Sequence, residues 1–222
     1  TTEIYTLSLH DALPISAQAH LGSLYASGRH VKPNPELALT YLSRAAGQDD
    51  ANGLYGLGLL HLNGQGIAAN AERATEYLTR AMERGHIDAA FQLGEIYRTG
   101  RNGPLNPTAA AKAYYRAAAK GHPAAQRWMG DLTRDGIGVK ANDETAARWY
   151  RLSAAAGDAT ALSRYGECLR DGRGVARDPA AAVEYFRQSA DLGDPDGLVQ
   201  YGLLLEAGTE TAKNPTAAFQ LY

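Results

Sequence analysis

Glycine recurs in this 222-residue chain at a constant interval of 36 residues, and a second glycine follows each one after six residues. The first glycines of the six copies are Gly22, Gly58, Gly94, Gly130, Gly166 and Gly202. A constant period without insertions is typical of a stack of similar supersecondary units, and a single globular core would not produce it. The sequence therefore predicts a repeat protein with five full copies and a truncated sixth.

Each copy is predicted to contain two helices. The first helix carries one apolar residue immediately before the first glycine and another two residues after it, and both lie on one helical stripe. In the fourth copy this helix is predicted over residues 123–133. The second begins at Asn or Asp, often followed by Pro as in Asn34-Pro35, because the side chain caps the helix and proline fits its first turn. We expect this helix to end at a glycine such as Gly85, where the first copy has Asp49.

Small residues recur at fixed helical positions and help to explain the high alanine content of the chain, which has 41 alanines. Alanine lies 16 residues after the first glycine in every copy, and Ala or Gly lies five residues before it. Such positions let neighbouring helices approach closely. Because one helix pair cannot bury its apolar stripe alone, stacked copies share a continuous core. The predicted fold is an all-α, α/α superhelical solenoid of helix-turn-helix repeats.

The motif A-x-x-x-L-G-x-x-Y-x-x-G, followed by a loop and N-P-x-x-A, resembles the Sel1-like repeat family, which is related to the tetratricopeptide repeat. Residues 89–100, AAFQLGEIYRTG, match this pattern well. The resemblance covers residues 16–222 and implies adaptor or scaffold roles. We expect the copies at about 16–50, 51–86, 87–122, 123–158, 159–194 and 195–222.

Residues 1–15, TTEIYTLSLHDALPI, are similar along their whole length to a translated sequencing-library adapter. They lack an initiating Met, a basic start and the apolar core of a signal peptide. We therefore interpret them as an artefact that precedes a bacterial metagenomic fragment of residues 16–222. Both ends of this fragment would expose apolar surface that a capping repeat normally covers, so we expect self-association through the uncapped ends.

Composition excludes several functional classes. The net charge of −2 argues against a broad nucleic-acid interface, which needs a strongly basic face. No stretch approaches the ~20 apolar residues of a membrane span. With one cysteine, no intrachain disulfide forms.

The motifs that suggest chemistry have simpler structural interpretations. The glycine loop 172–174 follows a helix and lacks a Lys-Ser/Thr pair, which favours an interhelical loop over a phosphate site. His86 and His122 recur in phase with Asp158 and Asp194. Equivalent positions in adjacent repeats lie ~8–10 Å apart, too far for shared metal ligation, so these four are predicted to be solvated helix-start residues.

Cys168 occupies an apolar row, which predicts a buried and inert thiol. No nucleophile, base and orienting group form a recognisable set, so we predict no catalytic residue, no metal site and no cofactor.

Tetratricopeptide repeats bind partners on the inward face of the first helix. By analogy, we define the first-helix stripe as the positions three before, one after and four after the first glycine. The stripe is apolar in the second copy, whereas copies three to five place an acidic residue and an arginine three residues apart, close enough to pair. The candidate partner-binding residues of the stripe are Tyr55, Leu59, Leu62, Phe91, Glu95, Arg98, Arg127, Asp131, Arg134, Glu167 and Arg170.

Two interpretations of this stripe stay open. It is either a solvated face with ion pairs along each helix, or a groove whose apolar part and arginine ladder grip an extended or helical peptide through its carboxylates. Trp128 is a further candidate, which either packs between helices or forms part of an exposed anchor.

The predicted function is a non-catalytic protein–protein interaction scaffold that binds a protein or peptide on its concave helix face. One alternative is an enzyme similar to the cysteine-rich relatives linked to β-lactam binding or hydrolysis. Those relatives are disulfide-paired, whereas this chain has the lone Cys168. The other alternative is the regulatory arm of a longer multidomain enzyme.

Overall fold

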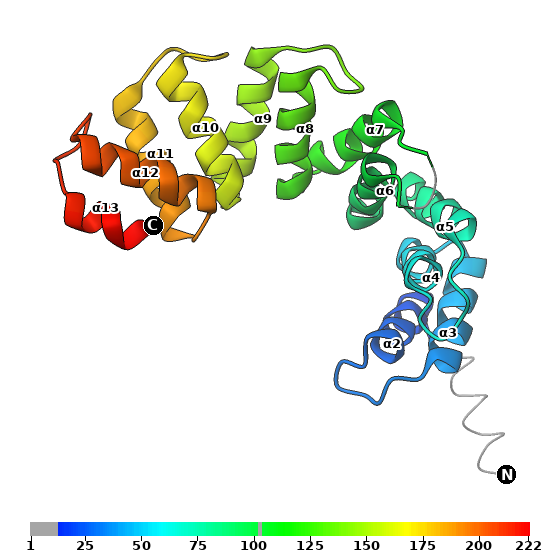
Figure 1. The fold of residues 1–222 in the computed structure, drawn as a ribbon. Helices are drawn as coiled ribbons and strands as arrows, with labels where there is room; N and C mark the ends of the chain where they lie inside the picture. The colour runs from blue at the N-terminus through cyan, green and yellow to red at the C-terminus, as the bar shows by residue number, and fades with distance from the viewer. Residues whose placement is uncertain (1–12, 102–103) are drawn as a thin grey trace, which may run out of the picture. The chain divides into compact units, whose positions relative to one another are not determined.

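In the computed structural model, which describes residues 13–101 and 104–222, the chain forms paired α-helices, and this described part contains no strand (Figure 1). The prediction of an all-α solenoid with a 36-residue repeat is confirmed. The artefact interpretation of residues 1–15 falls mainly on residues outside the described part and stays a prediction. The helices are α2 (Ile15–Ser27), α3 (Pro35–Gly47), α4 (Ala51–Asn63), α5 (Ala71–Glu83), α6 (Ile87–Thr99), α7 (Pro107–Ala118), α8 (Pro123–Asp135), α9 (Asp143–Ala155), α10 (Ala159–Asp171), α11 (Pro179–Asp191), α12 (Pro195–Ala207) and α13 (Pro215–Leu221).

The chain divides into two compact units, residues 1–105 and residues 106–222. The first contains α2 to α6 and the second contains α7 to α13. Within each unit, every helix packs on the next one along the chain. The first helices of adjacent copies also touch, as α2 and α4 do in the first unit and α10 and α12 do in the second.

Helix capping follows the predicted pattern for the second helices and corrects one prediction for the first. Asn34 caps α3 by accepting a hydrogen bond from the Leu37 backbone N–H at 3.0 Å. The Nδ1 atoms of His86 and His122 accept bonds from Ala89 and Ala125 in the same way, at 3.2 Å. Both histidines begin first helices as predicted, but they are half-buried caps and not fully solvated residues.

Asp158 and Asp194 cap α10 and α12, and Asp194 is only 7% exposed. Its carboxylate accepts bonds from the Gly197 backbone N–H of α12 at 2.9 Å and from the Thr160 hydroxyl of α10, the first helix of the preceding copy, at 2.8 Å. The capping residue of a first helix thus also connects two copies, which explains why it is withdrawn from water.

The ends of two helices differ slightly from the sequence prediction. Helix α5 ends at Glu83, and Gly85 follows in the left-handed region with φ 90°. In the first copy Asp49 adopts the same conformation with φ 62°, which Asp tolerates better than most residues. Helix α8 continues to Asp135, two residues beyond the predicted range of 123–133.

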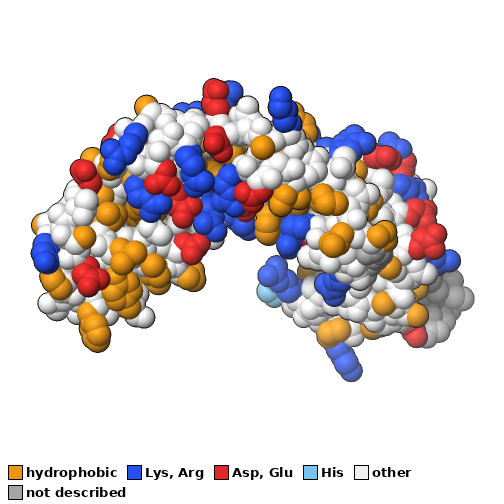
Figure 2. Space-filling view, turned by 45° about the horizontal axis from the view of Figure 1, so that its top comes forward, with side chains coloured by type: hydrophobic (Ala, Val, Ile, Leu, Met, Phe, Trp, Pro, Cys, Tyr) orange, Lys and Arg blue, Asp and Glu red, His pale blue; other side chains and the backbone are white. Residues whose placement is uncertain are grey.

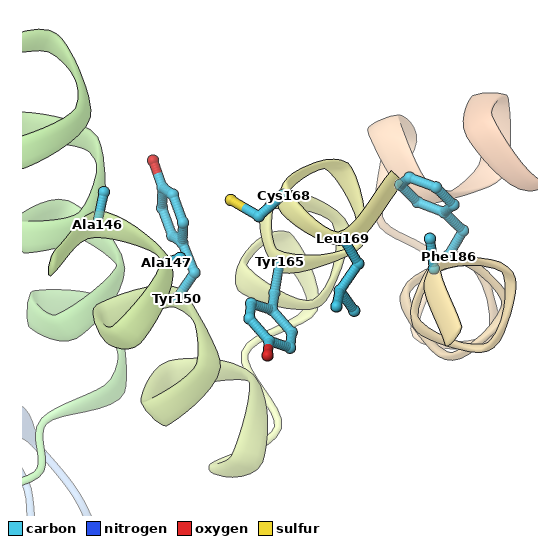
Figure 3. Close-up of a cluster of buried hydrophobic side chains, with 8 residues drawn as sticks. Ala146, Ala147, Tyr150, Tyr165, Cys168, Leu169 and Phe186 are labelled. Atoms are coloured by element: carbon cyan, nitrogen blue, oxygen red, sulfur yellow. The ribbon is translucent and has the colours of Figure 1, made fainter. Parts of the chain in front are cut away.

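The two apolar rows of the first helices form the core in the four inner copies and are half-buried in the first and sixth. The recurring alanines of the second helices are buried throughout: Ala38, Ala74, Ala110, Ala146, Ala182 and Ala218. This confirms that alanine marks close packing. Figure 3 shows one such region in the second unit, where Tyr150 of α9, Cys168 of α10 and Phe186 of α11 belong to one buried cluster.

The first glycine of a copy lies directly against the side chain that follows it by 20 residues. A Cβ atom added to Gly58 would lie 2.7 Å from Leu78, and one added to Gly130 would lie 2.4 Å from the ring of Tyr150. Separations below 3.0 Å are not seen for real Cβ atoms, so one side chain would have to move. The glycine is therefore required for the two helices of a copy to pack as they do.

We predict that Gly130→Ala lowers the free energy of unfolding by about 1–3 kcal/mol, because the added methyl overpacks a core against the fully buried Tyr150. The matched control is Gly47→Ala in α3, where an added Cβ meets no atom within 4 Å. Alanine is the better helix former there, by up to ~1 kcal/mol. Urea denaturation followed by circular dichroism measures both, and equal changes would contradict the packing argument.

Candidate functional site

The first-helix stripe is neither fully solvated nor part of the core. Tyr55, Leu59 and Leu62 of α4 are half-buried, and so are the candidate residues that α6, α8 and α10 contribute. Arg98 belongs to the first unit, whereas Arg134 and Arg170 belong to the second. Each unit is therefore described separately.

In the first unit, Tyr55 connects α4 with the start of α6, the first helices of two adjacent copies. Its ring stacks on that of His86, the cap of α6, with the ring centroids 4.1 Å apart. Burial lowers the pKa of His86, against the opposing effect of the Asp88 and Asp50 carboxylates. A neutral imidazole agrees with the acceptor role of its Nδ1 atom at the start of α6.

A groove of about 360 Å³ lies on the same face, lined by residues of the first two copies; we call it the α2–α4 groove. Ser23 and Ala26, the stripe residues of α2, face the larger Tyr55 and Leu59 of α4 across it. Of the four apolar candidates on the stripe, Tyr55 and Leu59 line the groove, whereas Leu62 and Phe91 do not. The signal for this groove in the sequence is the small size of the stripe residues in the first copy.

Glu95 and Arg98 form the predicted ion pair on α6, with 2.6 Å between Oε2 and Nη2. The equivalent pair on α8, Asp131 and Arg134, is longer at 3.8 Å. Arg134 instead binds the adjacent Asp135 at 2.7 Å, and this hydrogen bond raises the pKa of the arginine.

Asp131 is the centre of a network in the second unit. It lies 3.6 Å from Arg127 and accepts a hydrogen bond of 2.8 Å from the Tyr150 hydroxyl of α9. Arg127 also reaches Asp158, the cap of the next copy, at 3.5 Å. Burial, and then the charge of Asp131, raise the pKa of Tyr150. The network holds two first helices and one second helix together.

The predicted pairing of Glu167 with Arg170 on α10 was wrong. Glu167 lies 3.3 Å from Arg164, one turn earlier, and Arg164 also binds Asp196 of the next copy at 3.2 Å. Arg170 binds Asp171 at 2.7 Å. Glu167 has an arginine three residues away on either side, and sequence spacing within α10 reveals neither which one it binds nor that Arg164 also binds Asp196.

Arg170 also makes contacts beyond its own helix. Its Nη1 donates to the Gln200 side chain of α12 at 2.7 Å, and its guanidinium lies 5.9 Å from the centre of the Phe186 ring. Figure 2 shows Lys and Arg side chains mixed with acidic ones over this part of the surface. Arg170 is therefore held both by its own helix and by the next copy, whereas the partners of Arg134 lie on its own helix.

Trp128 of α8 is half-buried and stacks on Tyr114 of α7, with the ring centroids 6.0 Å apart. The guanidinium of Arg127 lies 4.8 Å from the centre of the indole ring. These contacts place Trp128 between two helices and beside the arginine network.

Cys168 is 6% exposed, and burial raises the pKa of its thiol to about 11. The prediction of a buried thiol is confirmed. In residues 13–101 and 104–222, no three His, Cys, Asp or Glu side chains are grouped so that they could hold a metal ion. Nor does a helix of this described part have the length and apolar character to cross a membrane.

Helices α12 and α13 expose large apolar side chains, of which Val199 and Leu203 occupy the stripe and Phe219 is 82% exposed. Figure 2 shows hydrophobic side chains gathered in this region. Self-association stays a prediction that concerns this surface.

The repeated, interlocked helix pairs define an α/α solenoid. A family model, that of the Sel1 repeat, matches the chain at residues 15–50, 51–86, 87–122, 123–158, 159–194 and 195–222. The chain belongs to the Sel1 repeat family. No curated protein matches the sequence.

Two solved structures illustrate the similarity. A protective antigen present in uropathogenic Escherichia coli strains is 30% identical, with a TM-score of 0.88 over 94% of this chain. This chain spans 45% of the length of that protein. A Sel1 repeat protein from Oxalobacter formigenes is 28% identical, with a TM-score of 0.78, over 94% of this chain and 83% of that one. Solenoids of this family generally act as protein–protein interaction modules and non-catalytic scaffolds.

We predict that Tyr150→Phe lowers the free energy of unfolding by about 1.5 kcal/mol, because it removes a hydrogen bond to a charged group. The matched control, Tyr115→Phe, alters a tyrosine that is 55% exposed and should change little. Since the folded state raises the pKa of Tyr150 above 10.0, its contribution is present below pH 10 and is lost at higher pH. Urea denaturation across this range checks both effects, and equal losses in the two variants would contradict the role of the hydrogen bond.

We also predict that the Cys168 thiol of the folded protein reacts with a disulfide reagent at pH 8 at least ~100-fold more slowly than in urea, because burial suppresses the thiolate. Absorbance of the released thiol measures the rate. Similar rates in both conditions would show that the thiol is accessible.

Proposed function

We propose that the chain is a non-catalytic scaffold or adaptor that binds a peptide or protein partner on its first-helix face. The observation that carries this proposal is the division of the stripe. On α4, in the first unit, it is apolar and lines the α2–α4 groove, whereas on α8 and α10, in the second unit, it carries arginines held by carboxylates. An apolar groove and fixed cations are each features through which proteins recognise peptides.

The arginines of the second unit suit this role because they are positioned yet accessible. Side chains of Arg134 and Arg170 keep 26% and 37% of their surface exposed. Their positions are set by Asp135, Asp171 and Gln200, so a partner would order them at little cost in conformational entropy. A carboxylate of the partner would accept hydrogen bonds from the remaining N–H groups of the guanidinium.

A non-catalytic role is supported by the state of Cys168, whose burial and raised pKa disfavour a nucleophilic thiolate. The chain spans 45% of the length of the Escherichia coli relative, so the activity of that whole protein is not assigned to this chain. A regulatory arm within a longer protein would use the same face for binding.

The test selects binding peptides from a displayed library of random dodecapeptides with the full chain, and then measures affinities by fluorescence anisotropy. We expect peptides that contain Asp or Glu to bind Arg134→Ala/Arg170→Ala about 5–30-fold more weakly than the wild type, since two charge-assisted hydrogen bonds are lost.

The matched control is Arg148→Ala/Arg151→Ala, which removes the same charge from exposed positions of the second helix α9. It should bind like the wild type. Equal weakening in both double variants would show that net charge, and not the position of Arg134 and Arg170, sets the affinity. Unchanged binding in both would likewise contradict the proposed role of these arginines.

A further inference from the structure

The α2–α4 groove combines an apolar interior with a polar rim. Leu42 and Leu60 are 0% and 1% exposed and form its deepest part, and Leu59 is half-buried beside them. Asn63 and Gln65, by contrast, are exposed. A ligand that fills this groove must place an apolar group inside and polar groups at the rim.

The rim carries a positive charge. Arg29, which is exposed and follows Gly28 at the end of α2, is the single charged residue among the described residues that line the groove. The side chains of Asn63 and Gln65 add amide donors on the α4 side. With no acidic group among these lining residues, the rim complements a carboxylate and disfavours a cation.

The space itself arises from the first copy. Its stripe residues, Ser23 and Ala26, are small, and their counterparts in α4, Leu59 and Leu62, are larger. In α6, α8 and α10 the same positions carry acidic residues and arginines that pair with each other or with neighbouring residues. The groove is therefore a property of the first two copies and does not follow from the repeat alone.

We infer that the α2–α4 groove binds a peptide segment in which a leucine-sized apolar side chain stands next to an Asp or Glu. The apolar side chain fills the space between Ala26 and Leu59, and the carboxylate binds Arg29 at the rim. This inference rests on the proposed function, because it assigns the partner chemistry of one part of the first-helix face. The peptide's acid comes from a side chain, and its backbone continues along the groove in both directions.

The probe is the blocked tetrapeptide Ac-Gly-Leu-Asp-Gly-NH2, which has no terminal charge, with Ac-Gly-Leu-Asn-Gly-NH2 as its neutral analogue. Each is titrated into the full chain while the methyl signals of Ala26 and Leu59 are followed by NMR. We expect saturable shifts of both signals, with the Asp peptide binding about 5-fold more tightly than the Asn peptide, as one exposed ion pair supplies. A third peptide, with Asn in place of Asp but a free C-terminal carboxylate, separates side-chain from terminal recognition.

Two variants locate the contacts. Arg29→Ala should make the Asp and Asn peptides bind equally, whereas the matched Lys32→Ala, in the same loop but outside the groove lining, should preserve the difference. Ala26→Leu fills the groove with a good helix former and should abolish the shift of Leu59 for every peptide. Because Arg29 and Lys32 are exposed, their replacement leaves folding intact.

The outcomes separate this inference from the proposed function. Equal binding of the Asp and Asn peptides to the wild type overturns the role of Arg29, and tighter binding of the peptide with the free C-terminus overturns the choice of a side-chain acid. Absence of any shift at Leu59 overturns the site. In each case, peptides selected from the library that depend on Arg134 and Arg170 would still support the proposed function, and it fails only if no such peptide exists.

Discussion

The close approach of the two helices in each copy is the contact on which the rest of the structure depends. The first glycine packs against the side chain 20 residues later, as Gly58 does against Leu78 and Gly166 against Phe186. This contact fixes the distance between the helices, and the buried alanines near the start of the second helix maintain it. With that distance fixed, the apolar side chains of one copy meet those of the next at a constant spacing, and the core continues along each unit.

The capping residues extend this constraint from one copy to the next. Asp194 holds the start of α12 and at the same time binds Thr160 of α10, the first helix of the preceding copy. His86 caps α6 and stacks on Tyr55 of α4. A residue type that ordinarily completes the hydrogen bonds of one helix end thus also sets how neighbouring copies align. These contacts help to position the first-helix face, and the candidate residues on α4, α6, α8 and α10 are half-buried.

Most of the fold could be predicted because it follows from short-range spacing. Helix pairs, caps such as Asn34 and the apolar rows repeat every 36 residues, and each copy supports the interpretation of the others. Side-chain partners were harder to predict. Glu167 binds Arg164 and Arg164 also binds Asp196 of the next copy, and no spacing within α10 contains this information. The half-burial of His86 was missed for the same reason, since its ring stacks on that of Tyr55.

The α2–α4 groove was hard to predict for a different reason. It exists because the first copy lacks large side chains at the stripe positions Ser23 and Ala26. The repeat is recognised from positions that hold the same residue type in every copy. A partner can distinguish one copy from another only through positions at which the residues differ. Ser23 and Ala26 differ from their counterparts in size and charge, and their side chains leave the space that Tyr55 and Leu59 border. In a solenoid whose shared residues maintain packing, we therefore expect specificity to reside where the first-helix stripe departs from the repeat.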